Sequence, residues 1–70
     1  MSISDLNSFY LKKFREYNKL LEKVDTALDK TESLKLIESL YQERLIIHTR
    51  LSVFKELLED LGELERLQNV

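Results

Sequence analysis

The sequence predicts an all-α fold, an antiparallel hairpin of two long helices. Apolar residues recur at steps of three and four, the spacing of one face of an α-helix. This pattern shifts by two residues between Leu28 and Ile37, which would turn the apolar face by about 200° around a continuous helix. Because a single rod would expose apolar stripes on opposite sides, we expect the chain to fold back. The composition, 34% charged and 43% apolar with one Gly and no Pro, is also typical of long helices.

The first predicted helix spans about residues 4–28 and contains no helix-breaking residue. Either Ser2 or Ser4 can cap it, and Asp5 lies where a carboxylate favours the positive end of the helix dipole. Its apolar seam follows heptad positions a and d, as in a coiled coil. The seam residues expected to form half of the hairpin core are Tyr10, Phe14, Tyr17, Leu21, Val24 and Leu28.

The turn is predicted at about residues 29–32, although this segment contains neither Gly nor Pro. Asp29 and Glu32 have the spacing of a capping box, and Thr31 is an alternative cap for the second helix. The shift of the apolar pattern therefore predicts the turn more strongly than the local residues do.

The second predicted helix begins near residue 33 and ends either at residue 61, before Gly62, or at residue 68. Arg44 occupies an a position, where it can pair with a Glu across the helices or extend its charged end to water. The whole chain, residues 1–70, is expected to form one domain. The residues that complete the predicted core are Ile37, Leu40, Ile47, Leu51, Phe54 and Leu58.

A second apolar stripe widens the apolar arc of this helix to roughly 160°, more than one antiparallel neighbour covers. The sequence therefore predicts assembly into a four-helix bundle or a coiled coil. Phe9 lies outside the main seam of the first helix, and aromatic residues are favoured anchors in protein interfaces. The residues expected in the interface with a partner chain are Phe9, Ile46, Val53, Leu57, Leu61 and Leu64.

No residue pattern indicates catalysis, and we predict a non-enzymatic protein without a cofactor or a metal. The chain has no cysteine, which excludes a thiolate nucleophile or ligand, and His48 is its single histidine, at a boundary position. The acidic residues near the C-terminus follow the solvent side of an amphipathic helix: Glu56, Glu59, Asp60 and Glu63.

A basic strip on the first helix is the feature that nucleic acid could use through phosphate contacts. A net charge of −2 disfavours nucleic acid and anionic membranes as partners, and Glu16 and Glu22 interrupt the strip. The apolar runs are too short for a membrane span and no signal-peptide pattern is present, so we expect a cytoplasmic protein. The strip consists of Lys12, Arg15, Lys19 and Lys23.

Two short segments, Leu20–Lys23 (LLEK) and Ile37–Leu40 (IESL), are similar to parts of the Rop-like plasmid RNA regulators, which are dimers of short helical hairpins. Phe14 resembles the RNA-contacting aromatic residue of that family, but here it lies on the buried seam. In size and layout the chain also resembles the helical-hairpin co-chaperones of type III secretion needles. These resemblances imply a nucleic-acid-binding regulator or a small subunit of a larger assembly. The residues themselves favour a protein-interaction module that self-associates through its second helix as a homodimer.

Overall fold

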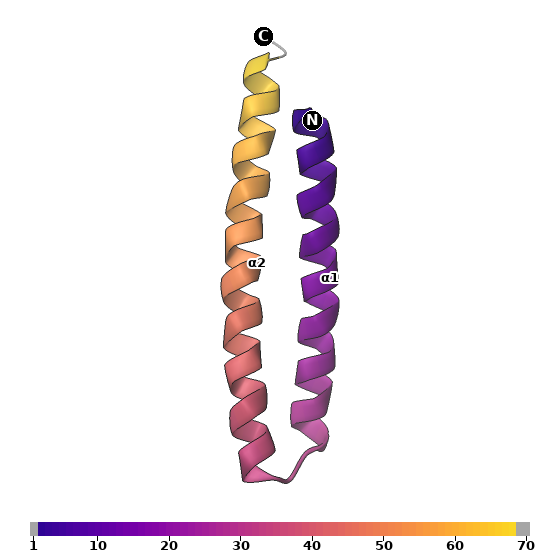
Figure 1. Ribbon diagram of the computed structural model, residues 1–70, viewed down its shortest axis with the longest axis vertical. Helices are drawn as coiled ribbons and strands as arrows, with labels where there is room; N and C mark the ends of the chain where they lie inside the picture. Colours follow the sequence, from indigo (N-terminus) through magenta and orange to yellow (C-terminus); the bar gives the residue numbers. More distant parts are fainter. Residues whose placement is uncertain (1, 69–70) are drawn as a thin grey trace.

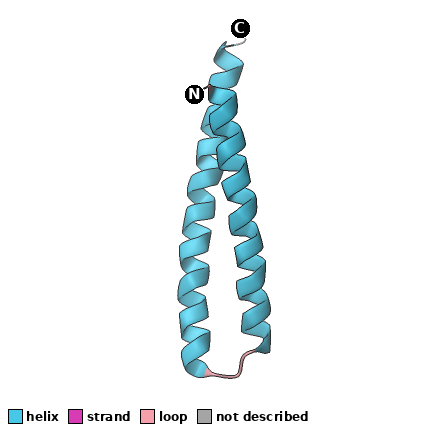
Figure 2. Cartoon of the chain, turned by 45° about the vertical axis from the view of Figure 1, so that its right-hand side comes forward, coloured by secondary structure: helices cyan, strands magenta, loops and turns pink. Residues whose placement is uncertain are grey.

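The computed structural model describes residues 2–68, which form two antiparallel α-helices (Figure 1). Helix α1 spans Ile3–Lys30 and helix α2 spans Leu34–Gln68. The all-α hairpin predicted from the shift in the apolar pattern is confirmed. Figures 1 and 2 show both ends of the chain at one end of a thin rod, opposite the loop, with α2 extending beyond the start of α1. The rod measures 55 × 17 × 14 Å.

A capping box fixes the start of α1. The Ser2 side-chain oxygen accepts a hydrogen bond from the backbone N–H of Asp5 at 3.1 Å. In return, the Asp5 carboxylate accepts one from the backbone N–H of Ser2 at 3.3 Å. These two bonds satisfy donors that a helix start leaves without partners. Of the two predicted caps, Ser2 is the one observed, and Ser4 lies inside the helix.

The end of α1 differs from the prediction by two residues. Asp29 and Lys30 are helical, so the expected capping box between Asp29 and Glu32 does not form. Thr31 ends the helix with an extended backbone, and its N–H donates to the carbonyl of Ala27 at 3.0 Å. The helix continues this far because no breaking residue stops it and because a lysine is favourable in a last turn.

Ser33, and not Thr31 or Asp29, provides the hydrogen bonds at the start of α2. Its side-chain oxygen accepts from the N–H of Leu36 at 3.5 Å, and its carbonyl accepts from the N–H of Ile37 at 2.9 Å. Thr31 instead stabilises the loop, because its Oγ1 accepts from the N–H of Ser33 at 3.4 Å. The loop therefore needs neither Gly nor Pro.

The core is a narrow seam between the two helices, and each residue of the predicted core is buried or half-buried in it. Among residues 2–68 no side chain is fully buried, which limits the stability that the hairpin gains from burial. The centre of the seam consists of Val24, Ile47 and Leu51, packed against Phe14, Tyr17, Leu21, Leu28 and Leu40.

Leu61 differs from the prediction that placed it in the interface with a partner. Its side chain is only 8% exposed. The Phe54 ring lies 6.0 Å from the Tyr10 ring, and the helices run antiparallel, so Leu61, two turns beyond Phe54, lies beside the first turn of α1. It is therefore part of the seam, as its heptad position also requires.

Helix α2 continues through Gly62, so the longer of its two predicted ends is the observed one. A Cβ atom added at Gly62 would meet no atom within 4 Å in the hairpin. Glycine inside a helix is less favourable than alanine by about 1 kcal/mol because it loses more backbone entropy.

Gly62→Ala is therefore expected to raise the free energy of unfolding by about 0.5–1 kcal/mol. Urea unfolding followed by circular dichroism measures this change, with Ser52→Ala as a control at another exposed position of α2. A loss of stability on Gly62→Ala would contradict the open surface at this position.

Candidate functional site

Large apolar side chains stay exposed on the hairpin, mainly along α2. Among the predicted interface residues, Ile46 is 53% exposed, Val53 50% and Leu64 47%, while Leu57 is half-buried. Further large apolar side chains outside the predicted interface are exposed as well; hydrophobic spacing alone does not show which side chains one neighbour covers. These residues are Leu11, Leu20, Leu34, Leu36, Tyr41, Leu45 and Leu67.

A groove of about 520 Å³ lies between the two helices, in the half of the rod nearer the loop. Its apolar lining comes from both helices: Leu20, Val24, Ala27, Leu40, Ile46 and Ile47. Tyr17 and three charged residues, Lys23, Glu43 and Arg50, complete the lining. An apolar centre with polar groups at its rim is the usual anatomy of a protein–protein interface.

The groove and the exposed stripe of α2 belong to one surface. Residues one heptad apart lie on nearly the same side of a helix. Val53 follows Ile46 by one heptad, and Leu57 and Leu64 follow Arg50 by one and two heptads. We call this surface the groove face; it consists of the groove lining together with Val53, Leu57 and Leu64.

Phe9 extends the groove face toward the start of α1, because it precedes Lys23 by two heptads. Its side chain is 50% exposed. The Phe9 ring meets the Tyr10 ring edge to face, with the centroids 5.3 Å apart, and the Lys13 ammonium lies 5.7 Å from its centroid. The structure thus places Phe9 at the border of the seam with one side open to a partner.

Arg50 is held at the edge of the groove by Tyr17. Its Nη1 donates to the Tyr17 hydroxyl at 2.7 Å, and its guanidinium carbon lies 5.6 Å from the centre of the same ring. The two residues are 33 positions apart in the chain, so heptad spacing alone does not predict their contact. This contact joins the helices and positions a cation on the groove face.

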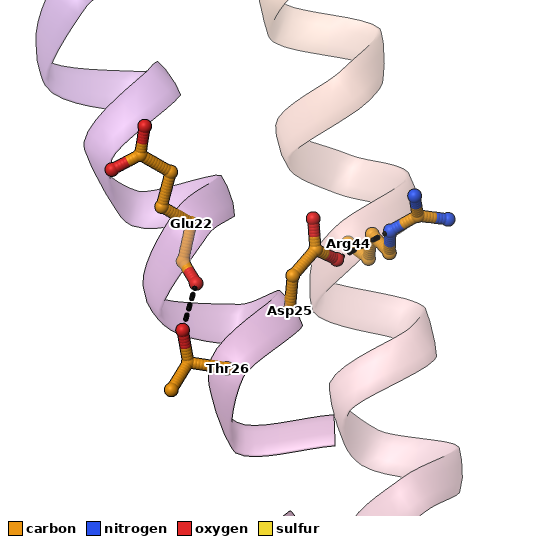
Figure 3. Close-up of polar contacts among 4 residues, drawn as sticks. All are labelled: Glu22, Asp25, Thr26 and Arg44. Carbon is orange, nitrogen blue, oxygen red and sulfur yellow. Dashed lines mark hydrogen bonds and ion pairs between the residues drawn. The ribbon is translucent and has the colours of Figure 1, made fainter. Parts of the chain in front are cut away.

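Arg44 lies at the other edge of the seam, where its Nε donates to the Asp25 carboxylate at 2.8 Å (Figure 3). The two side chains are 41% and 47% exposed. From the sequence, Arg44 was expected either to pair with a Glu or to extend its charged end to water. In the structure it pairs with an Asp on α1. Because water reaches both groups, the pair is expected to add little stability but to favour one alignment of the helices.

We expect the Asp25–Arg44 pair to contribute about 0.5–1 kcal/mol, the upper range for exposed pairs. A double-mutant cycle of Asp25→Ala and Arg44→Ala, followed by urea unfolding at low and high salt, measures this coupling free energy. The Lys13–Glu16 pair, with 3.7 Å between its charged atoms, is the matched control within one helix. A coupling no larger than that of the control would contradict a role in helix alignment.

The basic strip of α1 is exposed along its length, and so is His48 on α2. Acidic groups interrupt the strip: Glu22 lines a shallow depression together with Lys19, Lys23 and Thr26. On this side of α1, away from α2, the Thr26 hydroxyl donates to the Glu22 carbonyl at 2.8 Å (Figure 3).

The acidic residues of the C-terminal turns, Glu56, Glu59, Asp60 and Glu63, are exposed as well. Within residues 2–68, no three His, Asp or Glu side chains come close enough together to hold a metal ion. Over the same residues, neither helix combines the length and the hydrophobicity needed to cross a membrane.

Comparisons of this chain with protein-family models, with curated proteins and with solved structures give no match.

Proposed function

We propose that the chain is a cytoplasmic, non-enzymatic protein-interaction module that self-associates through α2 as a helical-hairpin dimer. One observation carries the proposal: the hairpin leaves more large apolar side chains exposed than it buries. Ile46, Val53 and Leu64 are each about half exposed. The apolar residues that the hairpin buries are Val24, Ile47, Leu51 and Leu61, each 7–8% exposed. A contiguous apolar surface of this kind marks an interaction site in most water-soluble proteins.

The dimensions of the hairpin support a second copy as the partner. Its broad side, 55 Å long and 17 Å wide, offers at most roughly 900 Å², and each partner buries roughly 600–1,000 Å² in an ordinary stable interface. Two such hairpins form a four-helix bundle when their apolar faces pack together. A second copy offers the same apolar surface in return, as a twofold interface requires.

The thermal unfolding temperature of the chain is expected to depend on its concentration, because dimer formation stabilises the folded state by mass action. Between about 5 and about 500 μM, we expect the midpoint to rise by roughly 5–10 °C. Circular dichroism at both concentrations measures this shift. A midpoint that stays the same would contradict self-association, and the groove face would then favour a subunit of an assembly with a different helical chain.

A further inference from the structure

We propose that the two copies pack with α2 antiparallel to α2 of the partner, so that Glu43 pairs with the partner's Arg50. The twofold axis then passes beside Ile46 and Ile47. This inference rests on the proposed function, because it names the arrangement of the same interface. Four observations support it: the position of two charges, the symmetry of the α2 sequence, the location of the groove and the contacts between α1 and α2.

Glu43 and Arg50 are opposite charges on the otherwise apolar part of α2 that lines the groove. They are seven residues apart, about 10.5 Å along a helix, which is too far for an ion pair within one chain. Among residues 2–68, neither of them forms an ion pair at 4.0 Å or less, with Lys23 of the same groove or with any other group. Tyr17 binds one nitrogen of Arg50, and a guanidinium has further N–H groups to offer a carboxylate.

In a twofold dimer, if residue i meets residue j of the partner, then j also meets i. An antiparallel pair centred between Ile46 and Ile47 places Glu43 opposite the partner's Arg50. The same alignment places Leu36 opposite the partner's Leu57, and Leu40 opposite the partner's Val53. Each apolar residue among these meets an apolar residue, and each charge meets the opposite charge.

The alignments nearest to this one bring like charges together. A shift by one heptad in one direction places Glu43 opposite the partner's Glu43, and a shift in the other direction places Arg50 opposite the partner's Arg50. A parallel pair in register places Glu43 opposite the partner's Glu43 and also Arg50 opposite the partner's Arg50. Like charges across an interface are unfavourable and exclude wrong alignments, so the two charges select the centred antiparallel pair.

The groove lies where this axis would pass. Tyr17 contacts Arg50, and Asp25 contacts Arg44. In sequence, Ile47 is midway between Arg44 and Arg50, and Leu21 is midway between Tyr17 and Asp25. Ile47 and Leu21 therefore lie at the same level along the rod. Leu20, the neighbour of Leu21 in the chain, is 44% exposed and lines the groove. In the proposed dimer the two copies of Leu20 meet near the axis and fill the groove from both sides.

Charge reversal tests the pairing directly. Glu43→Arg and Arg50→Glu each turn both Glu43–Arg50 contacts into like-charge contacts, and we expect each to raise the dimer dissociation constant about tenfold at low salt. An equimolar mixture of the two variants restores opposite charges at both contacts and is expected to assemble about as tightly as the parent. Glu59→Arg, an exposed reversal outside the groove face, is the matched control and is expected to have no such effect. Sedimentation velocity measures all four samples.

Cross-linking gives a readout that does not depend on charge. The parent has no cysteine, so Ile46→Cys introduces a single thiol beside the axis, within reach of its copy in the partner. Ser39→Cys is the control at the same heptad position, about 22 Å along the axis from its copy in the antiparallel pair. Mild oxidation is expected to link the first variant into dimers and to leave the second unlinked.

The outcomes separate the two proposals. A parent chain that sediments as a monomer overturns the proposed function together with this arrangement. A dimeric parent whose two charge-reversed variants assemble as tightly as it does, or whose Ser39→Cys variant cross-links as readily as Ile46→Cys, overturns the arrangement alone.

Discussion

Phe54→Ala is expected to lower the free energy of unfolding by about 2–4 kcal/mol, the cost of removing a large core side chain that is not fully buried. The Phe54 ring lies 5.4 Å from the Tyr17 ring and 6.0 Å from the Tyr10 ring, so it contacts two turns of α1 at once. The substitution deletes both aromatic contacts and opens the seam between the helices. Aromatic pairs add to the stability that apolar burial alone provides.

Urea unfolding followed by circular dichroism measures this loss, with all samples at one protein concentration because assembly contributes to stability. Lys55→Ala is the control at the adjacent exposed position and is expected to change the free energy of unfolding by less than about 0.5 kcal/mol. Ile47→Ala, at a residue only 8% exposed, is expected to behave like Phe54→Ala. Equal effects of Phe54→Ala and Lys55→Ala would contradict the observed seam.

Val53→Lys combined with Leu57→Lys is expected to abolish the dimer and to keep most of the helix content at low temperature. Val53 is 50% exposed and Leu57 is half-buried. Lysines at these two positions therefore destabilise the isolated hairpin less than lysines at buried seam positions would. In the dimer the same positions would bury charged groups without partners, which is strongly unfavourable. The melting temperature should fall and lose its dependence on concentration.

Ser52→Lys combined with Glu56→Lys is the matched control, because it places two lysines at the same spacing on exposed positions outside the groove face. Size-exclusion chromatography with light scattering and circular dichroism follow both double variants. Dissociation of the control, or a dimeric Val53→Lys/Leu57→Lys variant, would contradict the assignment of the interface to the groove face.

Hydrophobic spacing was sufficient to predict the hairpin and where its seam runs. The shift between Leu28 and Ile37 predicts two helices, and Val24, Ile47 and Leu51 lie at the centre of the observed core. Seam residues are predictable because burial follows the helical period and depends little on what the neighbouring side chains are. The exposed fractions of Ile46 and Val53 could not be predicted from the sequence, because they depend on how much of the α2 surface α1 covers.

Helix ends and polar contacts between the helices were harder to predict. Thr31 and Ser33 are ordinary polar residues, and local hydrogen bonds alone decide which of them ends α1 and which begins α2. The contact of Tyr17 with Arg50 depends on the relative alignment of the helices, which heptad positions give only to within a turn. Leu61 occupies a heptad seam position, and its burial, rather than an exposed place in a partner interface, follows that position.

Sedimentation equilibrium of the unmodified chain measures its self-association without any substitution. The mass of one chain is 8.4 kDa. We expect a single species of twice that mass at high micromolar concentration, dissociating on dilution as mass action requires. A mass of one chain at the highest concentration would contradict self-association.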